Sequence, residues 1–181
     1  MGNIGERHYE NEVKIEVIFP AFLEKNIIAS LKAAHPYEEV AYDVVNLSNT
    51  HPGIGAGLIG DLPAPLEERA FLHQLKSVFN LEVIRHTALR GKPVKRVALC
   101  GGAGSFLIFR ALNSNADAYI TADIKYHEFF DANGRLLIAD IGHYESEQFT
   151  IGLLAEYLVE KFPTFAVLKT EVKTNPVFYF R

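Results

Sequence analysis

The first ninety residues alternate between two patterns of apolar positions. In some segments about every second side chain is apolar, which is typical of half-buried strands. In another, glycines interrupt an apolar run, which is typical of a bulged strand. In two others apolar side chains recur every three or four residues, which predicts helices with one buried face. The expected strands are residues 11–20, 40–44, 54–63 and 83–89. The expected helices are residues 22–34, which end before Pro36, and 65–79, which open on a proline.

This order of elements, βαββαβ, is typical of a ferredoxin-like module, in which two helices cover one face of an antiparallel sheet. In this arrangement the strands at 40–44 and 54–63 form a hairpin. A polar turn with glycine and proline follows at residues 90–93, Arg-Gly-Lys-Pro. We therefore expect two domains, a ferredoxin-like module over residues 10–92 and a second domain over residues 93–181.

The second domain has a different pattern. Short continuous apolar runs, expected for strands buried on both faces of a parallel sheet, alternate with helical patterns. The expected strands are residues 97–100, 118–121 and 136–140, with closing strands at 166–172 and 177–180. The expected helices are residues 106–112, 127–132 and 144–161. The pattern predicts a mostly parallel α/β sheet.

Composition narrows the class of protein. The 181 residues carry a net charge of -4, so the chain has no basic field for nucleic acid, and we expect no nucleic-acid partner. No apolar run approaches the roughly 18 residues of a membrane span, and the N-terminus lacks the layout of a signal peptide. The single Cys100 cannot form an intrachain disulfide, and a small buried side chain is its simplest role. These features favour a cytoplasmic protein without a membrane partner.

Three polar or Gly-rich segments follow the three central strands, at residues 100–105, 121–127 and 141–147. In an open parallel sheet ligands bind beyond the carboxyl ends of the strands, so these segments are expected to meet at one edge. This convergence predicts a functional site without reference to any known protein.

His143 and Glu147 are four residues apart at the expected start of the last helix, so their side chains share one helical face. An imidazole and a carboxylate together suit zinc, manganese or iron. Two ligands make an incomplete site, since a structural metal needs about four and a catalytic one about three. The alternative is an ordinary helix start, where Glu145 and Glu147 are favoured by the helix dipole.

The segment after the second central strand holds Asp123, Lys125 and His127, which are the candidate catalytic residues. A carboxylate, an ammonium and an imidazole in one loop can transfer protons or bind an anion. A helix cap at Asp123 and a surface histidine at His127 explain the same residues without catalysis. Asp140 is expected either to support a metal ligand or to shape the turn before His143.

Two further segments carry weaker indications. The glycines of residues 101–104 could bind an anion through backbone N–H groups, although close strand-to-helix packing explains them equally well. Residues 35–40, His-Pro-Tyr-Glu-Glu-Val, suit a contact between subunits, a regulatory pocket or a plain solvated turn.

Three stretches resemble the C-terminal half of the Nif-three-like dinuclear-metal family, whose members are often named GTP cyclohydrolase 1 type 2 homologues. They are VALCGGAGS, AYITADIKYHE and IADIGHYESE, within residues 94–181. The stretches HPYEEVAYDVV and IGAGLIGDLP resemble the PII-like or CutA-like module that many bacterial members carry inserted in the core. The resemblance implies that His143 and Glu147 are metal ligands. It also implies a homohexamer with its metal centres facing an internal cavity.

The same resemblance places the other ligands, an adjacent His-His pair and an aspartate, in an N-terminal half that precedes the inserted module. No His-His pair occurs in these 181 residues, and Ala122 stands where the family has a glycine. We therefore expect a chain without the N-terminal half, whose dinuclear metal centre is incomplete or without metal.

Two functions follow as hypotheses. The first is a divalent-metal-binding, hydrolase-like protein of undefined substrate, GTP or another nucleotide included, acting through a metal-bound water. The second is a non-enzymatic protein that senses a small molecule or assembles into an oligomer, with a structural or vestigial metal.

Overall fold

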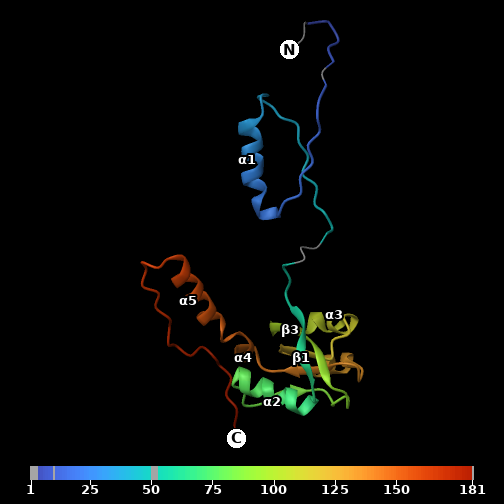
Figure 1. Cartoon of the computed structure of the whole chain (residues 1–181), viewed down its shortest axis with the longest axis vertical. Coiled ribbons are helices and arrows are strands. Elements are labelled where there is room, and N and C mark those ends of the chain that lie inside the picture. Colours follow the sequence, from blue (N-terminus) through green and yellow to red (C-terminus); the bar gives the residue numbers. More distant parts are fainter. Residues whose placement is uncertain (1–3, 10, 50–52, 181) are drawn as a thin grey trace. The chain divides into compact units, whose positions relative to one another are not determined.

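The computed structural model describes residues 4–9, 11–49 and 53–180 (Figure 1). The chain forms two compact units, residues 1–50 and residues 51–181, and each unit has its own architecture.

The described residues of unit 1 contain one α-helix, a short 3-10 helix before it, and no strand. The short 3-10 helix η1 (Ala21–Leu23) leads into α1 (Glu24–Ala34), as the apolar spacing predicted. The expected strands at 11–20 and 40–44 are absent, and the apolar side chains of Val13, Ile15 and Val17 are exposed. A strand is stable only when neighbouring strands bind its backbone groups, and the described residues of this unit supply no such neighbour. The ferredoxin-like module expected over residues 10–92 is therefore not confirmed.

Unit 2 contains a five-stranded sheet in the order β1-β3-β4-β5-β2. The three central strands are parallel: β3 (Val94–Ala103), β4 (Ala118–Ala122) and β5 (Leu137–Asp140). Both edge strands, β1 (Leu58–Leu66) and β2 (Arg85–His86), are antiparallel to their neighbours. The mostly parallel α/β sheet predicted from the apolar runs is confirmed.

Helices cover both faces of this sheet. The 3-10 helix η2 (Ser105–Leu107), α3 (Ile108–Asn113) and the 3-10 helix η3 (Tyr126–Ala132) follow β3 and β4 on one face, and α2 (Glu68–Phe79) covers the other (Figure 1). Side chains alternate accordingly, since Tyr119 and Ile138 pack against α3 while Ile120 and Leu137 pack on the α2 side. Burial on both faces explains why these strands are continuous apolar runs.

The expected domain boundary near residue 92 differs from the observed division. Strand β1 pairs with β3, and β1, α2 and β2 all belong to unit 2. The turn at Arg90 is held by buried charges: its guanidinium contacts Glu68 at 3.1 Å and Asp117 at 3.0 Å. The polar groups of a domain linker would lie in water, whereas the charged groups of Arg90, Glu68 and Asp117 are paired within unit 2.

The C-terminal part departs from prediction in two places. The single helix expected over 144–161 is interrupted at Gln148 and Phe149, giving α4 (His143–Glu147) and α5 (Thr150–Lys161). Neither closing strand, 166–172 or 177–180, is a strand in the described residues. Within the described ranges, no helix is both long and apolar enough to cross a membrane.

Candidate functional site

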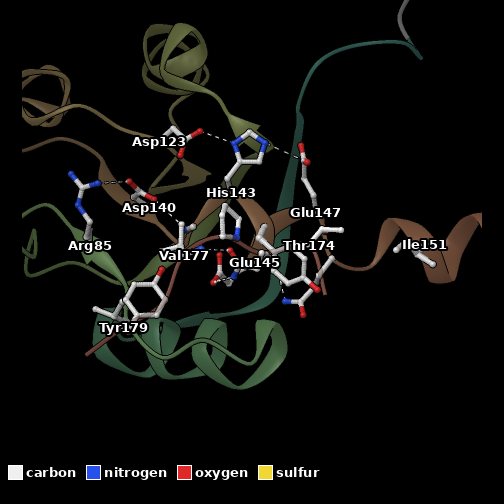
Figure 2. A pocket seen from close by; sticks show the side chains of 16 residues that line it. Arg85, Asp123, Asp140, His143, Glu145, Glu147, Ile151, Thr174, Val177 and Tyr179 are labelled. Atoms are coloured by element: carbon white, nitrogen blue, oxygen red, sulfur yellow. Dashed lines mark hydrogen bonds and ion pairs between the residues drawn. The ribbon is translucent and has the colours of Figure 1, made fainter. Parts of the chain in front are cut away.

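The carboxyl ends of β3, β4 and β5 bring three acidic or imidazole side chains together, as predicted. His143, the first residue of α4, lies between Asp123 and Glu147 (Figure 2). Its Nδ1 is 2.6 Å from Asp123 Oδ2, and its Nε2 is 3.4 Å from Glu147 Oε2. Because a carboxylate only accepts hydrogen bonds, Nδ1 carries a hydrogen toward Asp123, while Nε2 is the ring nitrogen that faces Glu147.

Two left-handed backbone positions aim these side chains. Asp123 follows β4 with φ of 56°, a conformation that aspartate tolerates better than most residues. Gly142 follows β5 with φ of 92° and immediately precedes His143. Each residue turns the chain sharply after its strand, which directs the side chains of Asp123 and His143 over the edge of the sheet.

A buried carboxylate ties the two turns together. Asp140 accepts hydrogen bonds from the backbone N–H groups of Ile124 (3.1 Å) and Gly142 (3.2 Å). Arg85 from β2 donates to Asp140 at 3.0 Å and to the Ile124 carbonyl at 3.0 Å. Asp140 therefore shapes the turn before His143, the second of the two roles expected for it, and ties that turn to the loop of Asp123.

The charge around His143 favours its protonated form. The hydrogen bond that His143 donates to Asp123 raises the pKa of His143, partial burial opposes this, and the charges of Asp123 and Glu147 add to the rise. A divalent cation at Nε2 would be favoured by the same carboxylates, because it replaces a proton with a larger positive charge.

The Gly-rich end of β3 lies directly against α4. The N–H of Gly102 donates to Ser146 Oγ at 2.8 Å, and the Ser146 hydroxyl donates to the His143 carbonyl at 2.7 Å. Gly101 and Gly102 thus pack against the helix that carries the candidate ligands, whereas Gly104 lies against Tyr119 and Thr121.

A cavity of about 660 Å³ opens beside His143. Asp123, His143 and Glu147 lie on its wall together with Arg85 and residues of the C-terminal segment (Figure 2). From that segment Asn175 donates to Glu145 at 3.2 Å, and Tyr179 lies near the same carboxylate, whose charge adds to burial in raising the pKa of Tyr179. The size is typical of small-molecule sites.

Arg85, Asn175 and Tyr179 were missed by the sequence analysis. Arg85 comes from an edge strand, Tyr179 comes from an expected closing strand, and Asn175 lies between the two expected closing strands. The one available indication was the turn-forming Asn-Pro pair at residues 175–176.

Lys125 and His127 lie outside the lining of the cavity. Both side chains are exposed, and the His127 ring packs edge-on against Tyr126 with centroids 5.3 Å apart. Their catalytic role stays a prediction, as does any role of residues 35–40, which belong to unit 1.

The donor set fits part of a metal site. In the portion of the chain that the structure describes, no group of three or more His, Cys, Asp or Glu side chains is arranged to hold a metal ion. His143 Nε2 and Glu147 Oε2 nevertheless present one nitrogen and one oxygen donor to the same space. The two residues fit a borderline metal such as zinc as half of its ligands.

Comparison with known proteins identifies the family of the chain. The family described as Duf34/NIF3 (NGG1p interacting factor 3) matches residues 8–176. A GTP cyclohydrolase 1 type 2 homolog of Bacillus subtilis is 32% identical over 180 residues, which is 97% of this chain and 48% of that protein.

Solved structures give the same result. A Bacillus cereus protein related to NIF3 is 32% identical with a TM-score of 0.69, over 90% of this chain and 46% of that one. A Staphylococcus aureus protein is 25% identical with a TM-score of 0.70, over 92% of this chain and 55% of that one. The chain spans about half the length of the curated relatives it matches. The family resemblance seen in the three strand-end motifs is thus confirmed, and the chain belongs to the Duf34/NIF3 family.

Proposed function

We propose that this chain supplies His143 and Glu147 as two ligands of a divalent-metal site in a hydrolase-like protein. The observation that carries the proposal is the 3.4 Å separation of His143 Nε2 and Glu147 Oε2. Zinc–nitrogen and zinc–oxygen bonds of about 2.1 Å at a tetrahedral angle place two ligand atoms about 3.4 Å apart. The two side chains already have the spacing that a shared metal requires.

Asp123 supports the same role from the far side of the imidazole. Metal-binding histidines generally donate their other ring N–H to a carboxylate, which fixes the tautomer and the orientation of the ring. Asp123 accepts from His143 Nδ1 at 2.6 Å, so Nε2 is the nitrogen left for the metal. The alternative, an ordinary solvated helix start, does not require a carboxylate at Nδ1 of its first histidine.

The metal site needs further ligands. Zinc, manganese and iron remain candidates, because each accepts mixed nitrogen and oxygen donors. In this proposal the remaining ligands come from a part of the family core outside these 181 residues, so this chain by itself binds metal weakly. The dinuclear centre of the resembled family belongs to the same proposal.

A divalent metal at this position would supply Lewis acidity for hydrolysis. The chain's own contribution is to bind and orient the substrate in the cavity beside it. Arg85, with its side chain 57% exposed, can donate to an anionic group there, while Asn175 and Tyr179 offer neutral hydrogen-bonding groups. Because the relatives are named GTP cyclohydrolase 1 type 2 homolog, a nucleotide is the first substrate class to test.

One observation favours the assembly hypothesis as a second candidate. No residue of α5 is buried, although Leu153, Leu154 and Tyr157 are large and apolar, with Leu153 67% exposed. Uncovered apolar surface of this kind is typical of protein contacts. A homo-oligomer such as the expected hexamer would cover α5, and the mass of the protein in solution by light scattering tests this.

Isothermal titration with zinc chloride tests the metal proposal. The variants are His143→Ala and the control His73→Ala, which removes an exposed imidazole of α2 that lies outside the cavity lining. We expect His143→Ala to weaken zinc binding by about tenfold or more and His73→Ala to leave it unchanged. Equal binding by wild type and His143→Ala would show that the ligand assignment is wrong.

The hydrolase part has a separate test. Metal-loaded protein that releases phosphate or opens the ring of a nucleotide, with loss of turnover in His143→Ala, supports the enzyme. Metal binding without turnover of nucleotides or other phosphoesters favours the assembly hypothesis instead.

A further inference from the structure

Gly102 occupies an unusual position near the end of β3. It is buried, its φ is +63°, and its N–H is bound by Ser146, one residue before Glu147. The pairing of β3 with β4 is irregular between Leu99 and Ala103, so the backbone departs from regular strand geometry at this point. The peptide at Gly102 therefore lies directly against the first turn of α4.

The space beside its α-carbon is filled by the two candidate ligands. A β-carbon at residue 102 would lie 2.6 Å from Glu147 Oε1 and 3.2 Å from His143 Nε2. Carbon and oxygen atoms that are not bonded prefer separations well above 3 Å, so a methyl group there cannot coexist with the observed carboxylate. Any side chain at this position would enter the space that both donors face.

We propose that Gly102 is a positioning residue of this site: its missing side chain lets the Glu147 carboxylate approach the Nε2 face of His143. The functional meaning of this approach rests on the proposed metal site. The geometric statement does not, because it concerns only the separation of two side chains.

The two ligands would respond differently to a methyl group at residue 102. The His143 ring is fixed by Asp123 through Nδ1 and by its place at the start of α4. The Glu147 carboxylate is the end of a flexible, exposed side chain, and its contact with His143 Nε2 is long, at 3.4 Å. Gly102→Ala should therefore turn Glu147 away and leave the Asp123–His143 pair in place.

Gly134 provides a matched control. Its φ is +65°, almost the same as that of Gly102, yet nothing lies within 4 Å of a β-carbon built on it. Gly134→Ala thus has the same backbone strain without the contact. A difference between the two variants reports the side-chain space at residue 102.

Zinc titration of the full chain is the first measurement. We expect Gly102→Ala to weaken zinc binding by about tenfold, the size of effect seen when groups that orient metal ligands are changed. Gly134→Ala should bind zinc like the wild type and lose a similar amount of thermal stability. Equal zinc affinity in Gly102→Ala and Gly134→Ala would overturn the proposal.

A double variant shows whether Gly102 acts through Glu147, and it removes the clash should Gly102→Ala fold poorly. In the background of Glu147→Ala, the additional Gly102→Ala change should leave zinc affinity unaltered. A further loss of similar size in that background would overturn the proposal, because the methyl group would then act on something else.

Crystal structures of the two glycine variants separate this proposal from the metal proposal. If wild type and His143→Ala bind zinc equally, the metal assignment fails, and the position of Glu147 decides the role of Gly102. A carboxylate displaced from His143 in Gly102→Ala, but not in Gly134→Ala, supports it. An unchanged separation near 3.4 Å in Gly102→Ala refutes it.

Discussion

Asp140→Asn is the sharpest test of how the fold supports the site. The Asp140 side chain is 5% exposed, and its two oxygens accept from different loops. Oδ2 receives Arg85 and the Ile124 N–H, while Oδ1 receives the Gly142 N–H. An asparagine of the same shape turns one of these acceptors into an NH2 group, whichever way its amide is oriented.

The cost follows from these contacts. When a buried N–H faces another donor in place of an acceptor, the free energy of unfolding falls by about 1–3 kcal/mol. Loss of the charge weakens the contact with Arg85, but that side chain is 57% exposed, so water limits this part to about 0.5–1 kcal/mol. We expect the free energy of unfolding to fall by about 1.5–4 kcal/mol in total.

Urea unfolding followed by circular dichroism measures this change. Asp131→Asn is the control, because the Asp131 carboxylate takes part in none of the hydrogen bonds or ion pairs found among the described residues, and its cost should stay within about 0.5 kcal/mol. Zinc affinity should fall in parallel by about tenfold, since the loops of Asp123 and His143 lose their common support. An Asp140→Asn variant as stable as Asp131→Asn would refute the reasoning.

Three further predictions concern the interior of unit 2. Glu68→Gln should lower the free energy of unfolding by about 2–3 kcal/mol in urea titrations, because the buried carboxylate accepts from the Arg90 and Gly91 N–H groups and from the Arg90 guanidinium. The pKa values of Glu68 and Asp117 are lowered, since burial raises them less than their hydrogen bonds to backbone and Arg90 lower them. These groups therefore stabilise the fold fully above the ordinary carboxyl pKa, and the urea midpoint should drop as the pH falls below that pKa. A urea midpoint that does not change with pH in this range would contradict the prediction. Tyr119→Phe should cost about 1–2 kcal/mol in thermal unfolding, because the buried hydroxyl, whose pKa burial raises to about 12, donates to the Gly104 carbonyl at 2.7 Å; an unchanged midpoint would show that this bond contributes nothing.

The centre of the sheet could be predicted from sequence because its strands are buried on both faces. Such burial requires continuous apolar runs, and the runs at 97–100, 118–121 and 136–140 are all within or next to observed strands. The meeting of Asp123, His143 and Glu147 followed from the same fact, since parallel strands place their carboxyl ends at one edge.

The edges of the sheet could not be predicted in the same way. Alternating patterns at 11–20 and 40–44 show only that a segment suits a strand, whereas strand formation depends on a partner elsewhere in the chain. Strand β1 pairs with β3, a partner that the local pattern of β1 does not reveal. Arg85 was missed for a related reason: it meets Asp140 across an antiparallel edge pair, 55 residues away in sequence.

The interruption of the helix expected over residues 144–161 shows a third limit of prediction from sequence. Helical spacing continues through residues 144–161, yet the Gln148 side chain donates to the carbonyls of Phe79 and Glu145. Contacts of this kind depend on how α2 packs against α4 and have no signature in the local pattern. The short α4 that results confines His143 and Glu147 to a single rigid turn.

The two outer strands of the sheet also affect how copies of the chain can associate. Proline cannot donate a backbone hydrogen bond, and β1 carries Pro63 and Pro65 within its nine residues. Strand β2, at the opposite edge, is two residues long. Both borders are thus poor templates for a strand from another molecule, which protects against edge-to-edge aggregation. We therefore expect any ordered assembly of this unit to use side-chain surfaces and not extension of the sheet.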